Sequence, residues 1–207
     1  MTRHRILVIG VGPHADMCSA VLESMGCWEI AGHVARDREE ACLSGITVVG
    51  LDDELPVLRQ NFDMAFVGIG DAVIRERMIK EVGSLGFTLA SAVAPSAVIA
   101  PDVEIRPGSL ISPGAVVNTG AKLGIAVIVN SGAVVEHHCV VGDFSHVAPN
   151  ATLCGNVVIE SHCLIGAGSV VLPNIRIGHG ATLAAGAAAA RDVGSGQVAG
   201  LPRRAPS

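Results

Sequence analysis

A six-residue period dominates the second half of the chain. Every sixth position from Val93 to Leu183 is Val, Ile or Leu, sixteen positions with no break in phase. The residue two positions before each of them is usually Ala, Ser or Cys. A period of six fits neither an α-helix nor an ordinary β-strand. It is typical of a parallel β-helix, in which each unit is a short strand plus a turn and its aliphatic side chain points inward.

The same pattern predicts how the units stack. Three units close one triangular coil, so residues eighteen apart lie about 4.8 Å from one another, the spacing of neighbouring strands. Between Ile105 and Ala190 only six residues are charged, which is too little polar surface for amphipathic helices. We therefore expect residues 93–207 to form a β-helix of slightly more than five coils, followed by a C-terminal tail.

The first part of the chain, residues 1–92, has a different composition. It carries 13 acidic and 8 basic residues, whereas residues 93–207 carry six of each. Apolar segments predict strands at 5–10, 28–34, 46–49 and 64–69, and helices are expected at 15–25 and 72–85. Alternating strands and helices imply a parallel sheet. The predicted architecture is a small α/β, Rossmann-like βαβ domain followed by the β-helix domain.

Overall composition excludes several classes of protein. The mean hydropathy is +0.52, but Gly, Asn, Ser and Pro interrupt the uncharged stretches, so no membrane-spanning helix is expected. Six Cys without metal-like spacing and no visible secretory signal predict a cytoplasmic protein with reduced thiols. A net charge of −5 gives no general attraction to nucleic acid. We expect neither nucleic-acid nor membrane partners.

Two motifs are more specific than the repeat. Residues 130–149 read Asn-Ser-Gly-Ala-Val-Val-Glu-His-His-Cys-Val-Val-Gly-Asp-Phe-Ser-His-Val-Ala-Pro, and residues 10–14 form a loop of the type GxGxH. Joined to the βαβ domain and the β-helix, they resemble the sialic acid O-acetyltransferase-like sugar acyltransferases. That family includes the hexapeptide-repeat sugar-nucleotide N-acetyltransferases of bacterial glycan synthesis. The resemblance covers nearly the whole chain.

The resemblance implies an architecture and a reaction. Such proteins are homotrimers of left-handed β-helices, with the co-substrate acetyl-CoA between neighbouring subunits. The acceptor implied is an amino group of a nucleotide-linked amino sugar, acetylated by direct transfer. The low charge of the repeat agrees with a trimer, because apolar flat faces would be buried by association.

A histidine is the expected general base, because a pKa of about 6.5 suits proton removal at neutral pH. The resemblance assigns this role to His137. Where the family commonly has Glu or Asp at the next position, this chain has His138. Glu136 and Asp143 are the local carboxylates that could orient His137, and the sequence does not choose between them. A neutral His138 could also hold the ring as an acceptor.

The resemblance also implies the binding residues. His146 would contact acetyl-CoA near the thioester, the backbones of Ala167 and Ala185 would meet the pantetheine arm, and Arg204 would meet the phosphates. The expected substrate-binding residues lie in the first domain and are Gly10, Gly12, Pro13, His14, Asp37, Gly70 and Asp71. The positive end of a helix dipole behind the GxGxH loop favours an anion there.

Two positions of this substrate site depart from the family pattern. Pro13 replaces a second Gly and removes a backbone N–H donor. Ala35-Arg36-Asp37 stands where an acidic pair is expected.

Three other functions fit parts of the pattern. The first is O-acetylation of a free sugar such as sialic acid, and the second is a non-catalytic trimeric β-helix scaffold. The third is a zinc enzyme of the γ-carbonic anhydrase type, which uses two His separated by four residues. His137, His138, His146, His162 and His179 form no such pair, so no metal is expected.

Overall fold

The computed structural model describes residues 3–43 and 46–200. The chain divides into two compact units, one formed by Met1–Pro95 with Pro107–Leu110 and the other by Ser96–Arg106 with Ile111–Ser207. The domain boundary expected at Ala92 stays a prediction. None of the described helices is both long and apolar enough to cross a membrane.

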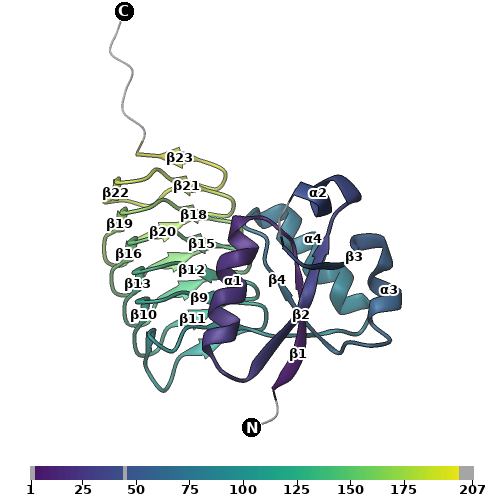
Figure 1. Cartoon of the computed structure of the whole chain (residues 1–207). Helices are drawn as coiled ribbons and strands as arrows, with labels where there is room; N and C mark the ends of the chain where they lie inside the picture. Colours follow the sequence, from purple (N-terminus) through teal and green to yellow (C-terminus); the bar gives the residue numbers. More distant parts are fainter. Residues whose placement is uncertain (1–2, 44–45, 201–207) are drawn as a thin grey trace, which may run out of the picture. The chain divides into compact units, whose positions relative to one another are not determined.

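The first unit is built around a five-stranded parallel sheet (Figure 1). Its elements are β1 (His4–Ile9), α1 (Pro13–Ser24), β2 (Trp28–Ala35), α2 (Arg38–Leu43), β3 (Val48–Leu51), a 3₁₀ turn η1 (Asp52–Glu54), α3 (Leu55–Leu58), β4 (Met64–Val67), α4 (Ala72–Ser84) and β5 (Thr88–Leu89). The strand order is β3-β2-β1-β4-β5, and every pair is parallel.

In this order β1 is the central strand, and the order in which the chain adds strands to the sheet reverses there. The chain runs from β1 outward to β3 on one side and continues with β4 and β5 on the other. The loops that follow β1 and β4 therefore diverge at one edge of the sheet, where open α/β sheets bind ligands. Ile6, Leu7, Val8 and Ile9 of β1 are fully buried, as expected for the central strand of a covered sheet.

The elements of this unit agree with the sequence pattern except for the short ones. The first helix begins at Pro13, two residues earlier than expected, because Pro is favoured in the first turn of a helix. α2, α3 and β5 are too short to give a recognisable period, and they were not expected.

The second unit is a parallel β-helix of two-residue strands (Figure 1). The strands of its three sheets are β6 (Ala92–Val93), β7 (Val98–Ile99), β8 (Glu104–Ile105), β9 (Leu110–Ile111), β10 (Val116–Val117), β11 (Lys122–Leu123), β12 (Ile128–Val129), β13 (Val134–Val135), β14 (Val140–Val141), β15 (His146–Val147), β16 (Thr152–Leu153), β17 (Val158–Ile159), β18 (Leu164–Ile165), β19 (Val170–Val171), β20 (Arg176–Ile177), β21 (Thr182–Leu183), β22 (Ala188–Ala189) and β23 (Val198–Ala199).

The strands form three sheets, and the period of six accounts for their register. Val117 of β10 pairs with Val135 of β13, which in turn pairs with Leu153 of β16. Partners are therefore eighteen residues apart, as one coil of three units requires. From Ile111 to Leu183 every sixth residue is at most 1% exposed. These side chains fill the core of the β-helix.

The turns of the β-helix repeat a left-handed backbone conformation. Every sixth residue between 108 and 186 has a positive φ, which Gly and Asn adopt most readily. His138 (φ 59°), Phe144 (φ 61°) and His162 (φ 62°) hold the same conformation. Left-handed backbone at such residues costs free energy, and it clusters at functional sites.

Candidate active site

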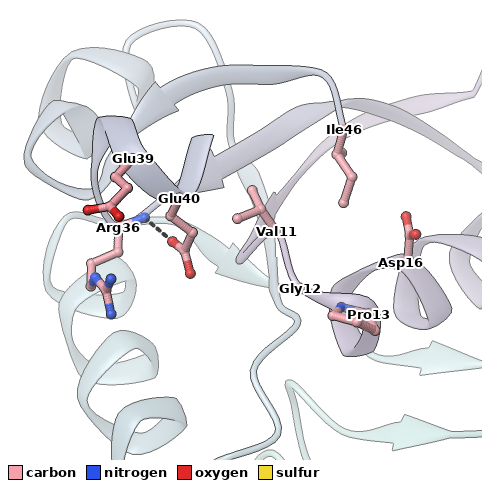
Figure 2. Close-up of a pocket in the computed structure, with 8 residues that line it drawn as sticks. All are labelled: Val11, Gly12, Pro13, Asp16, Arg36, Glu39, Glu40 and Ile46. Atoms are coloured by element: carbon pink, nitrogen blue, oxygen red, sulfur yellow. Dashed lines mark hydrogen bonds between the residues drawn. The ribbon is translucent and has the colours of Figure 1, made fainter. Parts of the chain in front are cut away.

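Two adjoining cavities open at the edge of the sheet where the β1 and β4 loops diverge. The first, of about 540 Å³, is shown in Figure 2 and is lined by Val11, Gly12, Pro13, Asp16, Arg36, Glu39, Glu40 and Ile46. The second, of about 430 Å³, is lined by Gly10, Val11, Gly12, Pro13, His14, Val34, Arg36, Glu40, Asp52, Gly68, Ile69, Gly70, Ile74 and Arg77. The residues common to both include the 11–13 loop, so the two cavities share a wall.

Five of the seven expected substrate residues line these cavities, namely Gly10, Gly12, Pro13, His14 and Gly70. Asp37 and Asp71 are not among the lining residues, and each caps a helix. Asp71 accepts from the backbone N–H groups of Val73 and Ile74 at 3.0 and 2.9 Å. Asp37 accepts from the N–H of Glu40 at 2.9 Å and pairs with Arg36 at 2.8 Å.

A buried arginine lies behind the second cavity. Arg75 of α4 is 1% exposed and donates to the carbonyls of Ile69 and Gly70 at 3.0 and 2.6 Å. Burial lowers its pKa to about 10, so it stays charged at neutral pH. Burial and then the Arg75 charge also lower the pKa of His14, so His14 is neutral at pH 7 and can both donate and accept.

A buried histidine fixes the start of the GxGxH loop. His33 of β2 is 4% exposed, and its Nδ1 lies 2.8 Å from the carbonyl oxygen of Gly10. Because a carbonyl only accepts, Nδ1 carries the proton. Its Nε2 lies 3.1 Å from the hydroxyl of Ser19. The polar contacts of His33 therefore hold the backbone that lines the second cavity.

Sequence reasoning missed the charged side chains of these cavities. Arg36 and Glu40 come from the segment after β2, where Glu40 Oε2 accepts from the N–H of Arg36 at 2.7 Å. Arg77 and Asp52 line the second cavity, and burial raises the pKa of Asp52 to about 6. The charged run directly after a strand end was the available signal for the first two.

Two histidines of the β-helix, His137 and His138, lie in the turn between β13 and β14. The Nδ1 atoms of His137 and His138 are 3.2 Å apart, and their rings meet edge to face with centroids separated by 5.4 Å. Both residues are exposed. The imidazole of His137 lies over Gly155 of the next coil, in space that a Cβ there would occupy. This turn therefore presents an accessible imidazole that a neighbouring imidazole orients.

The two candidate carboxylates are engaged elsewhere. Glu136 Oε2 accepts from the amide of Asn118 at 3.0 Å and from the backbone N–H of His137 at 3.4 Å. Asp143 Oδ1 accepts from the N–H of Ile125 at 2.7 Å. Within the described residues neither carboxylate is hydrogen-bonded to the imidazole of His137, and its ring partner is His138.

His146 of β15 has a defined tautomer. Its Nε2 lies 3.1 Å from Nδ2 of Asn130, and Oδ1 of Asn130 accepts from the N–H of Ser131 at 2.7 Å. The amide nitrogen of Asn130 is therefore the donor, and Nε2 of a neutral His146 accepts. The proton of that imidazole is on Nδ1.

Two of the remaining expected acetyl-CoA contacts, Ala167 and Ala185, lie on a different corner of the β-helix from His137. Ala167 follows β18 and Ala185 follows β21, and both are exposed, eighteen residues apart in successive coils. His137 instead follows β13, which belongs to another of the three sheets. Arg204 lies outside the described residues. In the part of the chain that the structure describes, no three His, Cys, Asp or Glu side chains gather as a metal site.

Comparison with known proteins covers both units. Residues 5–82 match the family model of the PglD N-terminal domain, and residues 156–188 match that of the bacterial transferase hexapeptide repeats. The structure of a histidine-to-asparagine variant of perosamine N-acetyltransferase from Caulobacter crescentus, in complex with CoA and GDP-perosamine, is 32% identical. That match covers 93% of this chain and 91% of the other, with a TM-score of 0.87. The chain belongs to the hexapeptide sugar acyltransferase family.

Two other solved members of this family are similar. The acetyltransferase domain of PglB from Neisseria gonorrhoeae, in complex with acetyl coenzyme A, is 30% identical, covers 95% of each chain and has a TM-score of 0.87. WeeI from Acinetobacter baumannii is 25% identical, covers 94% of this chain and 95% of the other, and has a TM-score of 0.81. The family assignment thus extends over both the cavities of the first unit and the histidine turn of the second.

Proposed function

We propose that this protein is an acetyl-CoA-dependent acetyltransferase acting on an amino group of a nucleotide-linked amino sugar. The observation that carries the proposal is the match over 93% of the chain to an N-acetyltransferase bound to CoA and GDP-perosamine. The accessible, ring-oriented His137 supplies the chemistry that such a transfer needs. The cavities around the GxGxH loop supply a place for the nucleotide.

In the proposed mechanism His137 acts as general base. The acceptor nitrogen attacks the thioester carbonyl while His137 removes its proton, so a C–N bond forms and the C–S bond breaks. The thiolate of CoA leaves and takes the proton back from His137. Direct transfer needs no covalent acyl-enzyme, and correct positioning of the two substrates provides a large part of the rate.

The proposed co-substrate site needs more than one chain. We assign acetyl-CoA to His146, Ala167, Ala185 and the Arg204 tail. Because Ala167 and Ala185 lie on a different corner from His137, a neighbouring subunit would bring a His137 to them. Exposed apolar side chains such as Val140 and Leu164, 40% and 41% exposed, support association through the faces of the β-helix. A homotrimer is therefore part of the proposal.

The proposed nucleotide site uses the charges of the first unit. The N-terminus of α1 and the guanidinium groups of Arg36 and Arg77 favour the diphosphate. With Pro13 at its first position, α1 offers the N–H groups of His14 and Ala15 for this purpose. The first cavity carries three carboxylates, those of Asp16, Glu39 and Glu40, beside the apolar side chains of Val11 and Ile46, so it would take an uncharged part of the ligand. Six free thiols and these substrates fit a cytoplasmic enzyme.

The experiment that tests this function is a panel assay of acetyl-CoA consumption. The acceptors are UDP-, dTDP-, GDP- and CMP-linked sugars with and without an amino group, together with free sialic acid. Turnover that requires both nucleotide and amino group supports the proposal. Turnover with free sialic acid assigns O-acetylation instead, and binding of acetyl-CoA without turnover on any acceptor favours the scaffold.

A further inference from the structure

The imidazole of His138 lies along the β-helix, toward the N-terminal coils. Its Cδ2–Nε2 edge lies against Gly120, eighteen residues earlier, in space that a Cβ on Gly120 would occupy. Gly120 in turn lies one coil above Asp102, again eighteen residues away. The backbone N–H of Gly120 donates to Asp102 Oδ2 at 3.0 Å. Asp102, Gly120 and His138 thus form a column on one corner, and only a glycine separates the carboxylate from the imidazole.

Asp102 is held as an anion that faces this column. The hydroxyl of Thr119 donates to its Oδ2 at 2.7 Å, next to the bond from Gly120. The hydrogen bond from Thr119 is the main cause that lowers the pKa of Asp102, and the nearby charge of His138 lowers it further. The carboxylate is exposed and is not hydrogen-bonded to His138 in the structure. It therefore acts on His138 through its electric field rather than by direct contact.

We propose that Asp102 is a positioning residue for the acetyl transfer, the carboxylate that orients the His137–His138 pair from two coils away. This inference rests on the proposed function, because it gives His137 the role of base. In this chain His138 occupies the position next to the base where the family commonly has a carboxylate, and Asp102 supplies the missing negative charge through it.

The geometry assigns each imidazole nitrogen of His137 and His138 to be either a donor or an acceptor. A negative charge below His138 favours a proton on its Nε2, the atom on the Gly120 side. Nδ1 of His138 then accepts, and the 3.2 Å contact requires Nδ1 of His137 to donate. The lone pair of His137 is left on Nε2, ready to remove a proton from the acceptor. When His137 becomes positive, the pair stays hydrogen-bonded and Asp102 offsets part of the charge.

One other charged group belongs to the same turn. The carboxylate of Glu136 is bonded to Asn118 and to the backbone N–H of His137. Glu136 stays in place when Asp102 is changed. A variant at Asp102 therefore removes one carboxylate and leaves the other.

Asp102→Asn tests the inference, because it keeps an oxygen for the Gly120 N–H and removes the charge. We expect kcat/KM for the amino sugar to fall about two- to fivefold, in the range of an exposed charge interaction. The acid side of the pH profile of kcat/KM should move to lower pH by about half a unit, since loss of a negative charge makes the base harder to protonate. KM for acetyl-CoA should not change.

Two control variants separate charge from structure. Thr119→Val removes the hydroxyl bond to Asp102 but keeps the carboxylate, so its pH profile should match that of the wild type. Glu104→Gln removes one negative charge from the same coil, where Glu104 pairs with Lys122 at 2.8 Å, and it should leave kcat/KM and its pH profile unchanged. If Asp102→Asn and Thr119→Val lose equal activity with no shift in pH profile, Asp102 only holds the turn and the inference is wrong.

Combining Asp102→Asn with a second substitution, His138→Glu, gives the most direct test. His138→Glu places a carboxylate next to His137, as in the family pattern, so Asp102→Asn should have no effect on kcat/KM in that background. An equal effect in both backgrounds would overturn the inference. A wild-type enzyme that acetylates no nucleotide-linked amino sugar is a different result, because it would reject the proposed function itself.

Discussion

The Nδ1 atoms of His137 and His138 lie 3.2 Å apart, so one of the two imidazoles must carry the proton between them. A pair of this kind holds both rings in one orientation without a carboxylate in contact. It also makes the two residues unequal, because only His137 lies toward the C-terminal coils, over Gly155.

Replacing His137 with Ala should abolish most of the turnover. Loss of a general base typically costs about 10²–10⁴ in rate, so kcat should fall by that factor. His137 is exposed and lies outside the core, so the melting temperature and the affinity for acetyl-CoA should stay close to those of the wild type. Near-normal kcat in this variant would remove His137 from the mechanism.

Gly155→Ala should displace the base without removing it. The nearest atoms to an added Cβ all belong to the imidazole of His137, which can rotate away, so the cost in stability should be small. We expect kcat to fall about tenfold or more, because small misplacements of a catalytic group are costly. Crystal structures of the variant would show whether the imidazole has moved. An unmoved ring with full activity would contradict the prediction.

His138→Glu should retain activity. A carboxylate next to His137 restores the arrangement that the family commonly has and should keep kcat within a few-fold of the wild type. The backbone at 138 has φ 59°, where Glu is less favourable than His, so we expect about 1 kcal/mol of lost stability in denaturant unfolding. If His138→Glu were inactive while folded, the imidazole of His138 itself would be required.

The raised pKa of Asp52 predicts that the stability of the protein depends on pH. Burial raises its pKa to about 6 in the folded chain, above the ordinary value of 3.8, so the folded state binds the proton more tightly. This contribution is favourable below about pH 4 and is lost as pH rises through 6. Asp52→Asn should therefore stabilise the protein at pH 7.5, on the order of 1 kcal/mol, and have no effect near pH 4. Urea unfolding at both pH values would measure the difference, and an equal change at both would contradict it.

Light scattering would test the trimer. The apolar outer side chains Val140 and Leu164 are about 40% exposed in a single chain, and association would bury them. We expect three times the mass of 21.1 kDa at micromolar concentration. Val140→Glu with Leu164→Glu should shift the mass toward that of a monomer. A wild-type monomer would leave the proposed acetyl-CoA site incomplete.

Much of this molecule could be predicted because its constraint is local and periodic. An aliphatic side chain at every sixth position from Val93 to Leu183 is buried when it points into the β-helix, so the spacing predicts the strands, the turns and the length of a coil. The loop Gly10–His14 was likewise visible because a tight turn between strand and helix selects Gly and tolerates Pro at the first helical position.

The parts that were missed depend on register or on polar contacts. Asp102 comes near the histidine pair only after two coils have stacked, and nothing within its own segment marks it. Asp37 and Asp71 both cap helices in the structure, and their role as ligand contacts stays a prediction. His33 follows an ordinary strand pattern, and its hydrogen bond to Gly10 requires the pairing of β1 with β2.

The eighteen-residue stacking also limits how such a chain can change in length. Inserting a single unit of six residues between Gly120 and His138 would keep every aliphatic side chain pointing inward and so preserve the core. It would nevertheless turn all later residues onto the next corner, and His138 would leave the column of Asp102. Only the insertion of a whole coil would return the histidines to their corner, and it would place them one strand spacing farther from the carboxylate. A chain with this core can therefore lose the alignment of Asp102 with His138 while it keeps its fold.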